Sequence, residues 1–146
     1  MFCSRIRRLG IITTLKTNTL TGTSTAGSIA VTGEGNSTTT NLQQGLAKQW
    51  CHYDGEGTPT LAGSFNVSSL NDLGTGQFQQ VCTNNFGDVN YSITAMTREE
   101  NGFHFIVEFD TTHQRTTALI FTSSGDKDGN VAEVDGRSVT VHGDLA

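Results

Sequence analysis

Between Gln49 and Val141, apolar and polar side chains alternate with a period of two residues, and this alternation limits the chain to a narrow set of folds. Successive side chains of a β-strand point to opposite faces, so the pattern predicts strands with one buried and one solvated face. Turn clusters rich in Gly, Asn and Asp separate the alternating runs. Seven or so short strands at this spacing predict a mainly all-β domain over residues 49–146, either an antiparallel β-sandwich or a jelly-roll-like fold.

The individual runs also predict which side chains share a face. Trp50 and His52 fall on one side of a strand, with Cys51 and Tyr53 on the other. The remaining sets expected to share a face are Phe65 with Val67 (Ser64, Asn66 and Ser68 outward), Val89 with Tyr91, Ile93 and Ala95, Phe103 with Phe105, Val107 and Phe109 (opposite His104, Ile106 and Glu108), Thr117 with Leu119 and Phe121, and Val139 with Val141. Residues 73–76 predict a turn because two of the four are Gly.

The composition agrees with a small β-rich domain. Hydrophobic residues make up 34% of the chain, below the roughly 45–50% of an average domain, a figure that counts Gly as well. Seventeen Gly and many Thr, Ser and Asn take their place, which favours strands and turns over helices. We therefore expect a thin core whose burial neighbouring subunits complete.

The first 48 residues follow a different pattern. Residues 1–35 predict an N-terminal arm with weak strands, and residues 36–48 predict a connector with one short helix of about three turns. Leu42 and Leu46 fall four residues apart on one face of this helix, and Trp50 continues that face. Asn36 to Thr39 supply capping side chains, whereas Gly45 weakens the helix by about 1 kcal/mol relative to Ala. Leu42, Leu46 and Trp50 are candidate oligomer contacts, or else they cap the β-domain of their own chain.

The charge is unevenly distributed. The first 33 residues carry four basic side chains and no acidic ones, whereas the remainder carries five basic and fourteen acidic side chains. An acidic body repels phosphates, so we expect no nucleic-acid partner. The basic arm either docks on an acidic protein surface or is a solvated terminus. No run approaches the roughly 18–20 apolar residues of a membrane span, and the segment 9–15 lacks a convincing cleavage site, so we expect neither membrane insertion nor export.

No grouping of residues predicts catalysis. The four histidines are isolated in sequence, without a Ser or Cys motif beside them. A glycan-cleaving site would need two convergent carboxylates. The available pairs are Asp54 with Glu56 and Glu108 with Asp110, which alternate outward on strand or turn positions. We expect neither pair to be catalytic.

We expect no metal site, cofactor or disulfide either. The segment 126–130 is similar to a calcium loop at first sight, but its Gly falls too early and Arg137 occupies the place of the closing Glu. Cys3, Cys51 and Cys82 form no metal-type pair, and their wide spacing favours free, buried thiols.

Several short motifs follow one another in the middle of the chain. They are Ala47-Lys48-Gln49-Trp50, Tyr53-Asp54-Gly55-Glu56-Gly57-Thr58, Ser64-Phe65-Asn66-Val67-Ser68-Ser69, Gly74-Thr75-Gly76 and Asn90-Tyr91. In this order they resemble a module of tail-fibre and other virion structural proteins of tailed bacteriophages. The segments 15–20 and 33–46 look like the lead-in strands and the connector of the same proteins, and Gly143-Asp144-Leu145-Ala146 is similar to their C-termini.

The resemblance implies a virion protein assembled in the host cytoplasm, tail-fibre-like or spike-like and homotrimeric, which contributes to host attachment by binding. Its arm would contact other virion proteins, and its partner on the host would be a surface glycan or protein. Two polar loops outside the shared motifs are the candidate receptor contacts, because binding residues concentrate in loops. Their candidate residues are His113, Gln114, Asp126 and Asp128.

Two other functions stay open at this point. The chain is short for a complete fibre, so it is alternatively a capsid decoration protein or an adaptor that joins a larger fibre to the tail. A glycan-binding or glycan-cleaving module is the second alternative. Trp50, Tyr53 and Tyr91 would stack on sugar rings in such a module, although buried core aromatics give the same sequence pattern.

Overall fold

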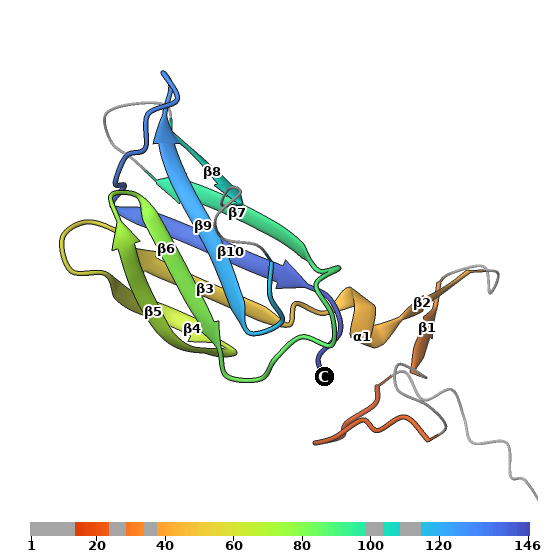
Figure 1. The fold of residues 1–146 in the computed structure, drawn as a ribbon. Helices are drawn as coiled ribbons and strands as arrows, with labels where there is room; N and C mark the ends of the chain where they lie inside the picture. The colour runs from red at the N-terminus through yellow and green to blue at the C-terminus, as the bar shows by residue number, and fades with distance from the viewer. Residues whose placement is uncertain (1–13, 24–28, 34–37, 99–103, 109–114) are drawn as a thin grey trace, which may run out of the picture.

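The computed structural model describes residues 14–23, 29–33, 38–98, 104–108 and 115–146 (Figure 1). Within these ranges the chain is an antiparallel β-sandwich of two four-stranded sheets, with a separate two-stranded hairpin and one short helix. This confirms the predicted fold class. The elements of the N-terminal part are β1 (Ala30–Thr32), β2 (Thr39–Asn41) and α1 (Leu42–Gly45). The sandwich strands are β3 (Gln49–Asp54), β4 (Thr60–Phe65), β5 (Val67–Gly74), β6 (Gln77–Cys82), β7 (Ser92–Arg98), β8 (His104–Glu108), β9 (Leu119–Asp126) and β10 (Gly136–His142).

The two sheets divide the chain in a simple way. The first sheet has the order β4-β3-β10-β7, and the second has the order β5-β6-β9-β8. The second sheet lies in front of the first in the view of Figure 1. The first and last strands of the sandwich, β3 and β10, pair at the centre of the first sheet. Of the four connections that cross between these sheets, those from β4 to β5 and from β7 to β8 join edge strands.

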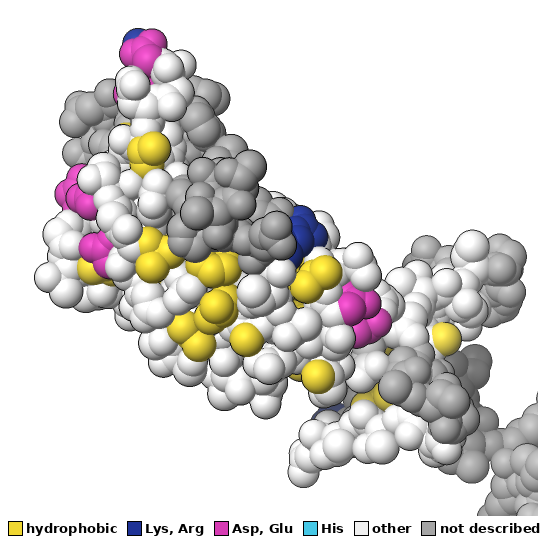
Figure 2. Space-filling model, in the orientation of Figure 1, with side chains coloured by type: hydrophobic (Ala, Val, Ile, Leu, Met, Phe, Trp, Pro, Cys, Tyr) yellow, Lys and Arg dark blue, Asp and Glu magenta, His cyan; other side chains and the backbone are white. Residues whose placement is uncertain are grey.

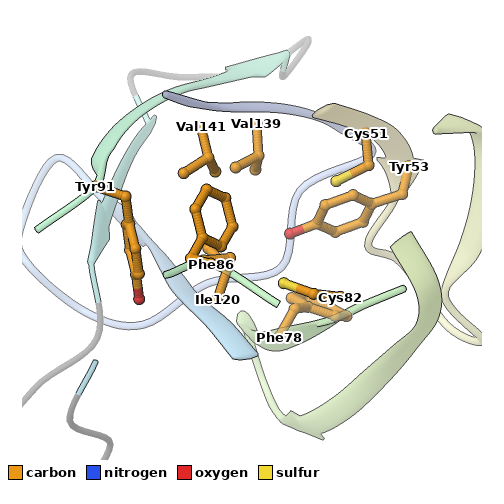
Figure 3. Close-up of a cluster of buried hydrophobic side chains, with 9 residues drawn as sticks. All are labelled: Cys51, Tyr53, Phe78, Cys82, Phe86, Tyr91, Ile120, Val139 and Val141. Atoms are coloured by element: carbon orange, nitrogen blue, oxygen red, sulfur yellow. The ribbon is translucent and has the colours of Figure 1, made fainter. Parts of the chain in front are cut away.

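The alternation along β3 has the predicted period and identifies its buried face. Gln49, Cys51 and Tyr53 are buried, whereas Trp50, His52 and Asp54 are exposed. Val139 and Val141, on the neighbouring strand β10, are buried as predicted. Figure 3 shows the resulting core between the two sheets. Its buried members are Cys51, Tyr53, Phe78, Cys82, Phe86, Tyr91, Ile120, Val139 and Val141.

The interior also contains hydrogen-bonded polar side chains, which the sequence pattern does not predict. Gln80 donates from Nε2 to the hydroxyl oxygen of Tyr53 at 3.2 Å and to Oγ1 of Thr122 at 3.1 Å. The thiol of Cys82 donates to Oε1 of Gln49 at 3.1 Å. Such bonds offset the cost of removing these groups from water, so the second sheet presents polar as well as apolar side chains to the core.

The segment around Asn66 corrects one prediction. Residues 64–69 were expected to form a single strand with Asn66 outward, but Asn66 is buried and separates β4 of the first sheet from β5 of the second. Its φ of 58° is in the left-handed region, which Asn tolerates better than most residues. Its Nδ2 donates to the carbonyl oxygens of Lys48 and Asn84, each at 3.0 Å, and Oδ1 accepts from the amide of Asn84 at 2.7 Å. Phe65 therefore does not share a buried face with Val67 and is half exposed.

The predicted helix is a single turn rather than about three. It begins after Asn41, whose side chain accepts a hydrogen bond from the amide of Gln44 at 3.1 Å, and it ends at Gly45. The cap is thus Asn41 and not a residue of 36–39, because the preceding residues pair with β1 as strand β2. Gly45 and the extended backbone of Leu46 end the helix, since Gly is a poor helix former.

Two other runs differ from the predicted pattern, and the first of them is only partly covered by the structure. In β8, Ile106 is half-buried and pairs with the buried Ser124, although an outward position was expected for it. The side chains of the other members of that run lie outside the described residues. In β9, Ile120 is fully buried in the core, and Phe121 on the opposite face is also buried. This strand is therefore covered on both faces, a case in which alternation no longer shows which face points inward.

Candidate binding surface

The outer face of the first sheet carries an unusual set of side chains for a solvent-facing surface. They alternate with the core residues of strands β4, β3, β10 and β7 and therefore point away from the second sheet. The outer face includes Gly63, Phe65, Trp50, His52, Ser138, Thr140, Thr94 and Met96. Beyond His52 on β3 it continues to the exposed Asp54, and beyond Met96 on β7 to the exposed Arg98.

The strand register arranges these residues in two rows. In one row Trp50 lies opposite Phe65 on β4 and Thr140 on β10, and Thr140 lies opposite Thr94 on β7. In the second row His52 lies opposite Gly63 on β4 and Ser138 on β10. Ser138 in turn lies opposite Met96 on β7. Strands lie about 4.8 Å apart and alternate residues about 6.8 Å apart, so the face measures about 14 by 7 Å between Cα positions.

The Trp50 side chain lies along this face rather than standing away from it. Atoms Cζ3 and Cη2 of its indole lie 3.5 and 3.7 Å from the position that a Cβ atom on Gly63 would occupy. The outer edge of the indole therefore reaches over β4, where a methyl group at position 63 would just touch it. Trp50 remains 43% exposed, beside Phe65 at 50% and on the same sheet as Met96 at 70%.

Polar groups flank the aromatic pair. Nδ1 of His52 lies 3.0 Å from Oγ of Ser138, so the imidazole and the hydroxyl are joined across β3 and β10. The hydroxyl groups of Thr140 and Thr94 lie in the row of Trp50. The two rows therefore combine aromatic side chains with uncharged hydrogen-bonding groups, and the charged side chains of Asp54 and Arg98 follow next to them on the same face.

The predicted oligomer contacts do not share one helical face. Leu42 is half-buried in α1, Leu46 is the residue after the helix and 53% exposed, and Trp50 lies in β3. Of the other two aromatics weighed for sugar stacking, Tyr53 and Tyr91 are both core residues. Of Trp50, Tyr53 and Tyr91, Trp50 alone is exposed.

The candidate receptor loop between β9 and β10 is organised by the carboxylate of Asp126. Its Oδ1 accepts from the amides of Asp128 and Asn130, both at 2.9 Å, and Oδ2 accepts from Nδ2 of Asn130 at 3.1 Å. Asn130 is the main reason that the pKa of Asp126 lies below its usual value. Asp128 and Lys127 form an exposed ion pair. Figure 2 shows acidic and basic side chains close together at the end of the sandwich where the loop between β9 and β10 lies. His113 and Gln114 lie outside the described residues.

The carboxylates considered for catalysis are only partly described. Oδ1 of Asp54 accepts from the amide of Glu56 at 2.9 Å, which is a turn-forming contact. The side chain of Glu108 and all of Asp110 lie outside the described residues. Across the described ranges, no group of three His, Cys, Asp or Glu residues is placed to hold a metal ion.

The two described cysteines are free and buried. Burial raises the pKa of Cys51 to about 12 and that of Cys82 to about 11. Both are therefore neutral thiols at physiological pH, which is the inert form. Cys3 lies outside the described residues.

Sequence reasoning found Trp50 and His52 as neighbours on one face but did not identify the surface. Phe65 was expected to share a buried face with Val67, and Met96 belonged to none of the predicted buried sets. Only the strand pairing brings these two residues to the same face as Trp50 and His52. Among the described residues, no helix has the length and apolar character needed to cross a membrane. Comparisons with protein-family models, curated proteins and solved structures found no match to this chain.

Proposed function

We propose that this chain is a structural component of a tailed-phage virion, a tail-fibre-like or spike-like protein that contributes to host attachment by binding, without catalysis. The motifs between Ala47 and Tyr91 support the virion assignment by their resemblance to tail-fibre modules.

The observation that carries the proposal is an N-terminal segment with uncovered apolar side chains. In Figure 1, β1 and β2 lie beyond one end of the sandwich and are joined to it through α1. Leu15, Leu20, Val31 and Leu46 in this segment are 76%, 52%, 52% and 53% exposed. Apolar surface of this kind gains stability when another surface covers it.

The β1–β2 hairpin gives the same indication. Each strand has three residues, and the two strands pair with each other alone among the described strands. A two-stranded hairpin of this size is marginal at best in water without further packing. The segment therefore fits a role in assembly, with three copies packing together and the arm contacting other virion proteins. The sandwich would then project from the assembly.

Immunogold labelling of phage particles with antibodies against the purified chain tests this function. Gold at the tail end supports a fibre or spike. Gold over the head supports a capsid decoration protein, and gold at the junction of the tail and a larger fibre supports an adaptor. Particles that carry no gold, although a known tail protein labels normally, contradict the virion assignment.

A further inference from the structure

We propose that the β1–β2 hairpin of one copy pairs edge to edge with the hairpin of a second copy, β1 of one beside β2 of the next, so that the hairpins of the trimer close a ring of antiparallel strands. This inference rests on the proposed function and deepens it, because it names the contact through which the N-terminal segment assembles the chain. The partner is a second copy of the same chain, and it supplies strand backbone to the contact.

The hydrogen bonds inside the hairpin show how its backbone groups are oriented. The amide of Leu42 donates to the carbonyl oxygen of Ile29 at 2.8 Å, and the amide of Gly33 donates to the carbonyl oxygen of Thr38 at 2.9 Å. In an antiparallel pair, residues bonded to the partner strand alternate with residues whose N–H and C=O groups point the other way. Residues 29, 31 and 33 therefore bond to the second strand, and their neighbours face outward.

The outward backbone groups belong to Ala30 and Thr32 on β1 and to Thr39 on β2. None of the described strands pairs with either of these two edges, and Figure 1 shows the hairpin set apart from both sheets of the sandwich. A row of unbonded N–H and C=O groups is a template for another extended chain. The chemistry of the edge therefore selects a β-strand as its partner.

The edges of the sandwich are less suited to such pairing. The register of β4 on β3 shifts between His52 and Tyr53, and the register of β5 on β6 shifts at two places. The edge strand β5 also carries the charged Asp72, and β7 and β8 lie against each other on the other side. Bulges, charges and covered edges are the features that prevent strand addition. The strands β1 and β2 have no register shift, no charge and no Pro.

The two faces of the hairpin decide which side lies inside the ring. Ile29, Val31 and Leu42 share one face, because alternate residues and cross-strand partners lie on the same side. The fourth residue of that face is Thr40. Val31 is 52% exposed, whereas the opposite face consists of Ala, Thr and Asn side chains. A ring with the apolar face inward covers Val31 of each copy and leaves the polar face in water.

Self-complementarity selects a second copy over a foreign strand. The two strands have three residues each, so each edge matches the other in length. Rotation about an axis parallel to the strands places β1 of one copy antiparallel to β2 of the next, and such a contact can close into a ring. A ring leaves no edge unpaired, whereas one foreign strand covers one edge. Residues 29–33 and 38–42 carry no charge, so identical hairpins meet without the repulsion expected between acidic sandwiches.

Hydrogen exchange of single amides, followed by NMR on the full chain, tests this pairing. In the ring the outward amides of Ala30, Thr32 and Thr39 donate to neighbouring copies. Their exchange should therefore be at least about tenfold slower than in an unstructured peptide of the same sequence. Exchange of all three at the peptide rate would overturn the proposal. Protection of Ala30 and Thr32 without Thr39 would also overturn it, because β1 would then pair with something other than β2.

A proline substitution tests the same edge by removing one donor. Thr32→Pro deletes an outward N–H that the hairpin itself does not use, and an edge position tolerates Pro. Light scattering should show the assembled mass falling to that of one chain. Thr32→Val keeps the amide and the branched side chain and should remain assembled. Circular dichroism and the melting temperature check that the sandwich is intact in both variants. A Thr32→Pro chain that assembles like the unchanged chain would contradict the pairing.

The ring and the virion assignment fail separately. Free exchange at Ala30, Thr32 and Thr39, in a chain that immunogold places at the tail, removes the ring and leaves the virion assignment standing. Protection of these amides in a chain that no phage particle carries leaves the ring standing and removes the virion assignment.

Discussion

The guanidinium carbon of Arg137 lies 4.2 Å from the ring centroid of Phe78, so that a fully buried cation from the first sheet stacks on an aromatic ring of the second. Its Nη1 donates to the carbonyl of Gly76 at 3.1 Å, and its Nη2 donates to the hydroxyl of Ser124. Burial lowers the pKa of this guanidinium. One side chain thus joins β10 to the β5–β6 turn and to β9.

Replacing Arg137 tests how much this contact stabilises the sandwich. Arg137→Ala removes the stacking and both hydrogen bonds and leaves a cavity, so we expect a loss of about 3–5 kcal/mol in the free energy of unfolding. Arg137→Met retains most of the volume and removes a buried charge, so it should cost less than half as much. Urea denaturation of both variants measures the difference. Equal losses for Ala and Met would show that side-chain volume contributes little and that the guanidinium contacts, which both variants lose, account for the effect.

The turn at Asn66 gives a second prediction about stability. Asn66→Gly retains the positive φ but loses the three hydrogen bonds to Lys48 and Asn84, for an expected loss of about 2–3 kcal/mol. Asn66→Ala loses the same bonds and adds left-handed strain of about 1 kcal/mol. Thermal or urea unfolding should therefore rank the three chains Asn, Gly, Ala. If the Ala variant is at least as stable as the Gly variant, the backbone argument is wrong.

The buried thiols predict a decline of stability in alkaline solution. Burial raises the pKa of Cys51 to about 12 and that of Cys82 to about 11, against an ordinary value of 9.0 for each. Burial also raises the pKa of Tyr53. Between the unfolded and folded values the folded chain holds more protons, so the free energy of unfolding falls as pH rises above about 9. Cys51→Ala with Cys82→Ala should flatten that decline, as pH-dependent urea midpoints would show. An unchanged slope in the double variant would rule out the thiols as its cause.

The loop held by Asp126 predicts an effect at the acid end of the scale. Because Asn130 donates to this carboxylate from both its amide and its side chain, the pKa of Asp126 lies below 3.8. The carboxylate of Asp126 therefore contributes to loop order above pH 3.8, the pKa of the unfolded chain. This contribution is lost as the pH falls through the lower pKa of the folded chain. Asn130→Ala should move the pKa of Asp126 back toward 3.8, measured by carboxyl NMR titration. A pKa that does not respond to the substitution would contradict the assigned cause.

The sequence predicts the strands well where one face of a strand is buried and the other is solvated. In β3 the alternation of Cys51 and Tyr53 with Trp50 and His52 follows the structure residue by residue. It fails in β9, because Phe121 and Ile120 are both buried and no alternation remains. A local pattern contains no information about what covers the second face.

Non-local contacts explain the other differences. The local sequence predicts a strand position for Asn66, because the two carbonyl oxygens that accept its hydrogen bonds, on Lys48 and Asn84, each lie 18 residues away. From the sequence, Arg137 would be taken for a surface cation, because the ring on which it stacks, Phe78, belongs to the opposite sheet. The outer face could be predicted only in part. Period two places Trp50 beside His52, but strand order decides that Phe65 and Met96 join them.

The central claim is that the N-terminal segment assembles copies of this chain, and its mass in solution tests that claim most directly. Light scattering after size exclusion should give about three times the 15.6 kDa of one chain. The Leu15→Ser, Leu46→Ser double variant should give the mass of one chain. Leu73→Ser, an exposed leucine of β5 in the sandwich, is the matched control and should remain trimeric. A mass of 15.6 kDa for the unchanged chain at every concentration would contradict the account.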